Sequence, residues 1–177
     1  IFALVMRLYQ WDKYAYSFYD EGIYAYFGVI SSYDPVLSTL YQPPLFFLIE
    51  GVLFSLFKTI FAFRLFNIFC SIASIFLAYN WIKKDYSVNE GLLVALLLST
   101  TAFHILHSRF LNQDILLFCL GLGALICVQE YEKHRKDWLL ILSGIFLGLG
   151  FFTKFTFLIF SFVIVFYAKY LKNVTIK

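Results

Sequence analysis

Long apolar stretches, separated by short polar ones, repeat along most of the chain. A helix that crosses a bilayer needs about 20 mostly apolar residues, and several of these stretches approach that length. The pattern predicts the end of one membrane helix at 1–9 and transmembrane helices at 63–82, 91–108, 114–129, 138–152 and 155–171. We therefore expect an all-α, polytopic membrane protein with about six transmembrane helices in a single membrane domain over residues 1–177.

The section 10–62 breaks this pattern because it contains polar, Tyr-rich and Pro-containing segments. It predicts a long loop with helices that lie in the membrane interface at 19–30 and 44–58. The second of these contains the apolar run LFFLIEGVLFSLF, which is long enough to be considered as a span. Glu50 lies within that run, and a carboxylate in the middle of a bilayer is costly. We therefore favour an interfacial helix over a span at this place.

Composition agrees with a lipid environment. The chain is 62% hydrophobic and 14% charged, with 23 Phe, whereas a soluble domain carries about 25% charged residues. So few charges do not cover the surface of a water-soluble globule. The net charge of +3 is small and indicates no nucleic-acid partner. Because the chain begins inside an apolar run, we expect it to be part of a longer protein.

Basic residues mark alternate ends of the predicted helices, which gives an orientation. They follow the helices at 63–82 and 114–129 and close the chain at the end of the helix at 155–171, and are Lys83, Lys84, Lys133, Arg135, Lys136, Lys169, Lys172 and Lys177. Cytoplasmic loops are enriched in Lys and Arg, so these ends are predicted to be cytoplasmic. The opposite, extracytoplasmic side then gathers Asp20, Glu21, Arg64, Arg109, Asp114 and Lys154. We expect an integral membrane protein, of a prokaryotic plasma membrane rather than the endoplasmic reticulum.

The carboxylates on this side have two interpretations each. Asp20 is followed by Glu21 near the start of a predicted helix, where an acidic side chain is favoured by the free amides and the helix dipole. Asp20 is equally suited to be a general base at a semi-dry interface. Asp114 lies where the chain re-enters the bilayer, so it either marks the interface or binds a substrate hydroxyl or amine.

The cations and histidines also leave alternatives open. Arg109 and Lys154 lie at the ends of apolar helices, where long cationic side chains commonly extend to the membrane surface. Together with Arg64, they could instead hold a phosphate. His104 and His107 are three residues apart and share a helix face, so they are weak candidates for a divalent metal and are otherwise satisfied by neighbouring groups. The sequence specifies no cofactor beyond this alternative.

Five segments in this order resemble the N-terminal half of the GT-C superfamily of glycosyltransferases: DEGIYAYFG, YQPPLFFLIEGVLFSLF, FRLFNIFCSI, HSRFLNQDILLF and GLGFFTKFTFL. The similarity is to protein mannosyltransferases (glycosyltransferase family 39) and to aminoarabinose lipid A transferases (family 83). It implies inverting transfer of a sugar from a polyprenyl or dolichyl phosphate to a protein or lipid acceptor at the extracytoplasmic face.

The resemblance also implies roles for individual residues. Asp20 corresponds to the base, with Glu21 beside it, and Asp114 to the aspartate of the second outer loop. Lys154 is expected near the lipid phosphate, with Arg109 as a weaker counterpart. We expect the lipid tail between the membrane helices and the interfacial helix at 45–57. The chain departs from both families at Gln42, where protein mannosyltransferases favour His before two prolines and the aminoarabinose enzymes have Glu-Lys-Pro.

Two other classes of function remain as alternatives. The chain could be a non-catalytic membrane subunit or lipid-binding scaffold of a larger complex, in which the helices of a glycosyltransferase serve only as a framework. A transporter is less consistent with the pattern, because the charged residues gather on one face and not at the midplane of the membrane.

Overall fold

The computed structural model describes residues 1–9, 19–38 and 41–175. Within these ranges the chain is helical and contains no strand, so the predicted all-α class is confirmed. The helices are α1 (Phe2–Leu8), α2 (Tyr19–Ser31), α3 (Pro35–Ser38), α4 (Leu45–Phe57), α5 (Phe61–Asp85), α6 (Val88–Thr100), α7 (Ala102–Arg109), α8 (Gln113–His134), α9 (Asp137–Thr153) and α10 (Phe157–Thr175). Residues 10–18 and 39–40 of the predicted loop, and Lys177, lie outside the described residues.

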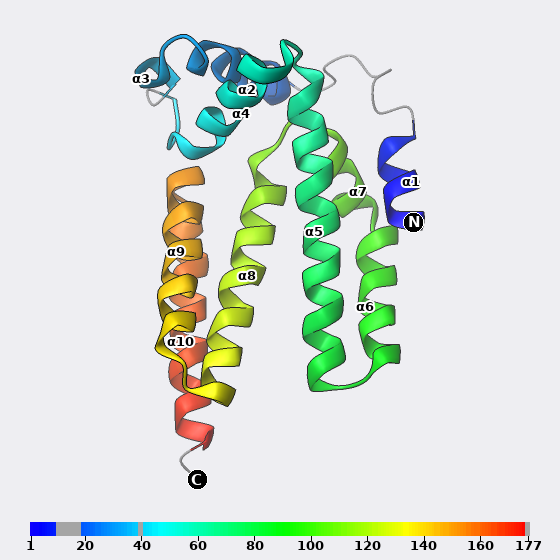
Figure 1. The fold of residues 1–177 in the computed structure, drawn as a ribbon, viewed down its shortest axis with the longest axis vertical. Coiled ribbons are helices and arrows are strands. Elements are labelled where there is room, and N and C mark those ends of the chain that lie inside the picture. Colours follow the sequence, from blue (N-terminus) through cyan, green and yellow to red (C-terminus); the bar gives the residue numbers. More distant parts are fainter. Residues whose placement is uncertain (10–18, 39–40, 176–177) are drawn as a thin grey trace.

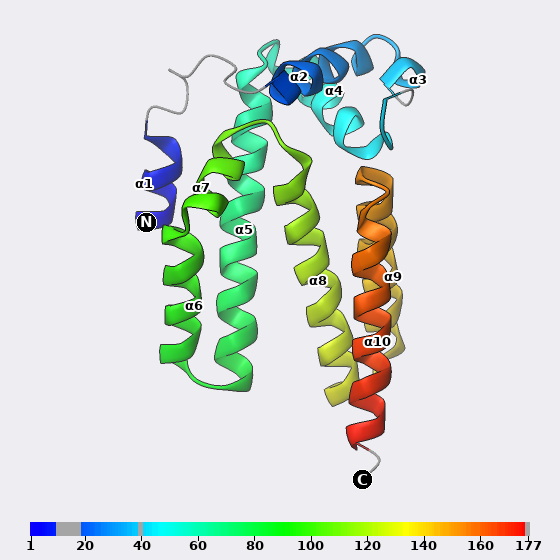
Figure 2. The same ribbon diagram turned by 180° about the vertical axis from the view of Figure 1, so that it is seen from behind.

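The helices form an upright bundle and a crosswise layer. α5, α6, α8, α9 and α10 run along the long axis of the molecule, whereas α2, α3 and α4 lie across its upper end (Figures 1 and 2). We refer to α2, α3 and α4 as the crosswise layer. Since upright helices that follow one another in the chain alternate in direction, the first residues of α5, α8 and α10 and the last residues of α9 all lie at the upper end. Segments far apart in sequence therefore meet beneath the crosswise layer.

The described helices differ in how well they could cross a membrane. α5 and α8, with 25 and 22 residues, are long and apolar enough to do so. α6 and α7 together would form a third span, but they are bent by 58°. α4, α9 and the described apolar part of α10 are shorter. The described residues thus show two spans, or three if the bent pair is counted, and not the six that we predicted.

The structure also divides the helix predicted at 91–108. α6 ends at Thr100 and α7 begins at Ala102, with Thr101 between them in an extended conformation. The hydroxyl groups of Ser99, Thr100 and Thr101 each donate to a backbone carbonyl about one turn earlier, and such bonds compete with the helical ladder and bend helices. The guanidinium of Arg7 in α1 donates to the carbonyl of Leu98 at 3.3 Å, close to the break. Local polar chemistry therefore interrupts an otherwise apolar span.

An aromatic core joins the crosswise layer to the bundle. Phe46 and Phe47 of α4 and Phe63 of α5 are fully buried, and the ring of Tyr24 in α2 lies 6.1 Å from both α4 rings. Gly28 lets α2 and α4 approach closely, because a Cβ atom there would lie 2.6 Å from the carboxylate of Glu50. Burial of these rings fixes the position of α2, and with it the side chains at its first turn.

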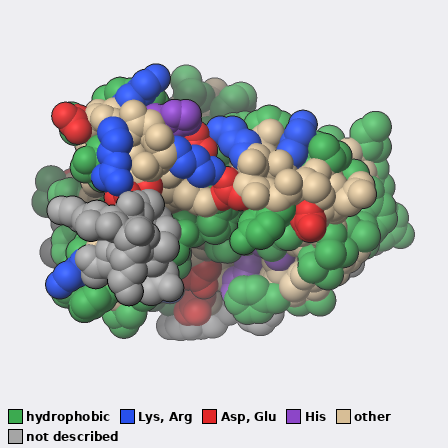
Figure 3. Space-filling view, turned by 90° about the horizontal axis from the view of Figure 1, so that it is seen from below, with side chains coloured by type: hydrophobic (Ala, Val, Ile, Leu, Met, Phe, Trp, Pro, Cys, Tyr) green, Lys and Arg blue, Asp and Glu red, His purple; other side chains and the backbone are tan. Residues whose placement is uncertain are grey.

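The lower end of the bundle carries many of the basic side chains on which the predicted orientation rests (Figure 3). Lys83 and Lys84 lie in the last turn of α5 and Lys133 in the last turn of α8. Asp85 pairs with Lys133, and Glu130 lies 3.4 Å from Lys84, so acidic side chains link the two helices there. The basic end of the bundle is therefore opposite the crosswise layer.

Candidate active site

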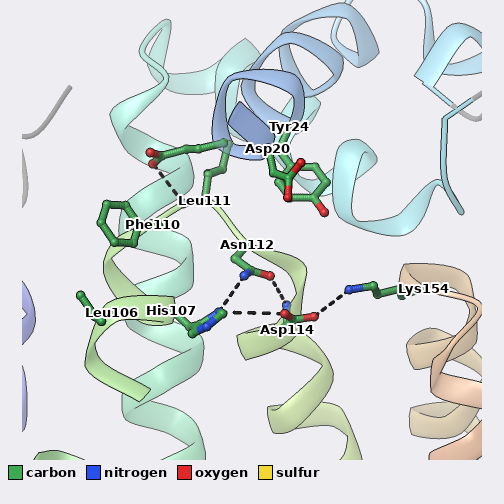
Figure 4. A pocket seen from close by; sticks show the side chains of 10 residues that line it. Asp20, Tyr24, Leu106, His107, Phe110, Leu111, Asn112, Asp114 and Lys154 are labelled. Atoms are coloured by element: carbon green, nitrogen blue, oxygen red, sulfur yellow. Dashed lines mark hydrogen bonds and ion pairs between the residues drawn. The ribbon is translucent and has the colours of Figure 1, made fainter. Parts of the chain in front are cut away.

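A pocket of about 280 Å³ lies where the crosswise layer meets the upper ends of α7, α8 and α9 (Figure 4). Its lining combines carboxylates, a cation, an imidazole and aromatic rings. The lining residues are Asp20, Glu21, Tyr24, Leu106, His107, Phe110, Leu111, Asn112, Asp114 and Lys154. The pocket thus brings together residues separated by more than half of the chain.

The adjacent carboxylates at the start of α2 have different environments. Asp20 and Glu21 are both in the first turn, where the free amides and the helix dipole favour negative charge. The side chain of Asp20 is exposed and borders the pocket. Glu21 also borders the pocket but is only 1% exposed. Successive residues of a helix point in different directions, so one carboxylate is available to a ligand while the other is held by the protein.

Glu21 and Arg64 form a buried ion pair. The Nε atom of Arg64 donates to Oε1 of Glu21 at 2.7 Å, and the backbone N–H of Leu111 donates to the same oxygen at 3.1 Å. Their side chains are 1% and 3% exposed, so water screens neither charge. The pair connects α2 with α5 and with the segment between α7 and α8. Arg64, which we predicted to hold phosphate, is therefore engaged with Glu21 and is not among the residues that line the pocket.

Asp114 and Lys154 face each other within the pocket. Asp114 lies in the first turn of α8 and Lys154 directly follows α9, and Nζ of the lysine donates to Oδ1 of the aspartate at 3.0 Å (Figure 4). Both side chains are partly exposed, at 41% and 29%. Asn112 caps α8 by accepting the backbone N–H of Asp114 at 2.8 Å, which fixes the start of this helix. An anion and a cation are thus both accessible to a ligand.

The two histidines that sequence spacing places on one face have different partners. His104 is 6% exposed and receives a hydrogen bond from Arg7 at 2.7 Å, with Ser74 near its other ring nitrogen at 3.2 Å. His107 borders the pocket, and its Nδ1 atom lies 3.9 Å from a carboxylate oxygen of Asp114. Across the described part of the chain, no group of three or more His, Cys, Asp or Glu could hold a metal ion. The structure thus does not bring His104 and His107 together around a common ion.

Arg109 ends α7 at the upper end of the bundle but is not among the residues that line the pocket. One of its terminal nitrogens donates to the backbone carbonyl of Tyr9 at 2.7 Å. Of the three cations that we predicted to hold phosphate, the structure places only Lys154 among the lining residues described.

Two residues that support the pocket were not identified from sequence. Asn67 of α5 is fully buried and donates to the carbonyls of Phe110 and Asn112 at 2.7 and 2.9 Å, which fixes the segment leading into α8. An Asn within the apolar stretch FRLFNIFCSI is a signal that could have indicated it, because buried polar groups in membrane helices are costly unless they are bonded. Tyr24 lines the pocket and has no such signal. Burial, together with nearby Tyr41, Asp20 and Asp114, raises the pKa of Tyr24 to about 12, so its hydroxyl stays protonated.

An apolar groove adjoins the polar pocket. It has a volume of about 280 Å³ and lies between α8 and the start of α10. Its lining residues are Asp114, Leu117, Phe118, Thr156, Phe157 and Phe160, so Asp114 borders both cavities. A second apolar groove of about 270 Å³ lies between α4 and α5 and shares no lining residue with the polar pocket.

Comparison with known proteins gives one match. A family model described as dolichyl-phosphate-mannose-protein mannosyltransferase matches residues 41–175, which is most of the chain and includes Asp114 and Lys154. No curated protein and no solved structure matches.

Proposed function

Because the chain belongs to the dolichyl-phosphate-mannose-protein mannosyltransferase family, whose members are membrane glycosyltransferases of the GT-C type, we propose that it transfers a sugar from a lipid phosphate. The donor is a polyprenyl- or dolichyl-phosphate sugar and the acceptor is a protein or lipid at the extracytoplasmic face. The observation that carries this proposal is the pocket in which Asp20, Asp114 and Lys154 meet from three separate elements.

The phosphate of the donor binds beside Lys154. The ammonium group of this lysine lies 3.0 Å from the carboxylate of Asp114, and both side chains are partly exposed, so a ligand can reach them. As the bond between the anomeric carbon and the phosphate oxygen breaks, negative charge grows on the phosphate. A fixed ammonium group next to that oxygen stabilises the charge more in the transition state than in the ground state.

The lipid tail occupies the apolar groove between α8 and α10. That groove shares Asp114 with the polar pocket, so a molecule with a charged head and an apolar tail fits both at once. The groove between α4 and α5 corresponds better to the position expected from sequence, but it shares no lining residue with the pocket. We therefore assign the tail to the α8–α10 groove.

Asp20 acts as the general base. Its carboxylate is exposed at the pocket, whereas that of Glu21 is buried against Arg64. Asp20 takes the proton from an acceptor hydroxyl or amine while the acceptor oxygen or nitrogen attacks the anomeric carbon. The new glycosidic bond forms as the carbon–oxygen bond to phosphate breaks, and the electron pair leaves with the lipid phosphate. Attack on the side opposite to the leaving group inverts the configuration at the anomeric carbon.

A binding measurement tests the donor site. The full-length protein in lipid nanodiscs is titrated with a panel of polyprenyl-phosphate sugars, and Lys154→Ala is compared with Lys84→Ala at the lower end. We expect Lys154→Ala to weaken binding about tenfold or more, and Lys84→Ala to leave it unchanged. An unchanged affinity in Lys154→Ala would remove this lysine from the phosphate site.

A double variant separates two explanations of weaker donor binding by Lys154→Ala. Without Lys154, the carboxylate of Asp114 would itself repel a phosphate. If Lys154→Ala/Asp114→Asn binds donor as the wild type does, the lysine only neutralises Asp114. If the double variant binds donor more weakly than Asp114→Asn alone does, Lys154 contacts the phosphate as proposed.

A further inference from the structure

His107 lies beside Asp114, on the side of the pocket formed by α7. It is in the last turn of α7, and its side chain is 26% exposed and lines the pocket (Figure 4). The ring packs against that of Phe103, with ring centroids 4.0 Å apart. Nothing in the proposed transfer reaction uses this imidazole.

The hydrogen bonds around Asn112 determine which nitrogen of His107 carries the proton. The Oδ1 atom of Asn112 caps α8 by accepting the N–H of Asp114 at 2.8 Å, so the amide nitrogen of Asn112 is the atom that faces His107. That nitrogen lies 2.7 Å from Nδ1 of His107. An amide NH₂ group can only donate, so the neutral imidazole accepts at Nδ1 and carries its proton on Nε2. The helix cap thus fixes the tautomer.

Comparison with His104 shows that His107 is not simply a packed histidine. His104 is 6% exposed and both of its ring nitrogens have partners, Arg7 and Ser71 at Nδ1 and Ser74 at Nε2. For His107, the described residues offer a partner to Nδ1 alone. An imidazole that is held at Nδ1 and lines a polar cavity has its Nε2–H left to donate a hydrogen bond to a ligand.

We infer that His107 and Asp114 together bind two adjacent hydroxyl groups of the transferred sugar, so that His107 helps to determine which sugar is accepted. Oδ1 of Asp114 is engaged by Lys154, whereas Oδ2 lies on the side of His107. One sugar hydroxyl donates to that carboxylate oxygen and its neighbour accepts from Nε2–H of His107. Two adjacent hydroxyl groups, a vicinal diol, can donate one hydrogen bond and accept another, which matches this pairing of a carboxylate acceptor with an imidazole donor. This inference rests on the proposed function.

The test compares donor affinity across a series of sugars. Full-length wild type, His107→Phe and His107→Gln in nanodiscs are titrated with polyprenyl-phosphate hexoses and with analogues that each lack one ring hydroxyl. Phe keeps an aromatic ring but has no donor, whereas Gln retains an N–H group. His134→Gln is the matched control, because His134 is exposed at the lower end of the bundle. Dissociation constants are measured for every pair of protein and donor.

The inference predicts that the effect of His107→Phe on affinity depends on which hydroxyl groups the donor carries. Wild type binds each of the two monodeoxy donors that lack one hydroxyl of the diol at least about tenfold more weakly than the parent sugar. One of these analogues lacks the hydroxyl that accepts from His107. His107→Phe binds the parent about as weakly as that analogue and no longer distinguishes the two, while His107→Gln retains most of the discrimination. If His107→Phe discriminates as wild type does, or loses affinity equally for all donors, the inference is wrong. A wild type that binds and discriminates donors but transfers none would contradict the proposed function alone, and one that binds none would overturn both.

Discussion

Removal of Arg64 should strongly destabilise the protein through the charge that it leaves behind. Arg64 and Glu21 are 2.7 Å apart with side chains 3% and 1% exposed, and loss of one partner of a buried ion pair costs about 3–5 kcal/mol. The pair between Lys84 and Glu130 provides a matched control, at 3.4 Å with side chains 58% and 18% exposed. Exposed pairs of this kind contribute about 0–1 kcal/mol. We therefore expect Arg64→Leu to lower the free energy of unfolding several times more than Lys84→Leu.

A double variant tests whether the buried charge is the cause. In Arg64→Leu/Glu21→Gln the carboxylate is replaced by a neutral amide, whose oxygen can still accept the N–H of Leu111. We expect this variant to recover about 1–2 kcal/mol relative to Arg64→Leu alone. Reversible unfolding in mixed detergent micelles gives the free energy of unfolding of the wild type, the two single variants and the double variant. The reasoning is refuted if Arg64→Leu is as stable as Lys84→Leu, or if the double variant is no more stable than Arg64→Leu.

Three further predictions concern the packing around the pocket. Gly150→Ala should lower the free energy of unfolding by about 1–3 kcal/mol, because its Cβ would lie 2.1 Å from the ring of Phe157. Gly148→Ala should be neutral or slightly stabilising, because no atom lies within 4 Å of the added Cβ. Thermal unfolding distinguishes the two variants. Glu50 is fully buried, and burial raises its pKa well above the usual value, so the folded state retains a proton that the unfolded state releases. Stability should therefore fall as pH rises from the ordinary pKa of Glu toward that of the folded state, and Glu50→Gln should remove this dependence; equal pH profiles for the two proteins would contradict it. Asn67→Ala should lower the unfolding free energy by about 1–3 kcal/mol, because two carbonyls of the segment before α8 lose their donor; an unchanged melting temperature would show that they find other partners.

Hydropathy predicted the helical class because an apolar segment in lipid must satisfy its backbone hydrogen bonds internally. It did not predict the break at Thr101. The hydroxyl groups that bend the chain there barely change the average hydropathy, yet they compete directly for backbone carbonyls. The position of Arg7 beside Leu98 depends on tertiary packing between α1 and α6, which no local pattern contains.

The candidate site was predictable to the extent that it depends on helix ends. Alternating helices place the ends that carry Asp114 and Lys154 on one side of the bundle, and the structure places both side chains in one pocket. The same reasoning failed to separate them from Arg64 and Arg109. Residues at helix ends lie at the same height along the bundle, but their side chains point in different directions. Those directions depend on how each side chain is buried against neighbouring helices. Arg64, for example, is buried against Glu21 and is not among the residues that line the pocket.

The most direct test of the proposed transfer is the turnover of Asp20→Asn. Full-length protein in nanodiscs is supplied with a polyprenyl-phosphate sugar and an acceptor, and both donor affinity and transfer are measured. Asp34→Asn is the control, since Asp34 lies in the same layer and accepts backbone N–H groups as Asn also can. We predict that Asp20→Asn binds donor normally but transfers no sugar, while Asp34→Asn is as active as the wild type. Wild-type turnover in Asp20→Asn would contradict the assignment of Asp20 as the base.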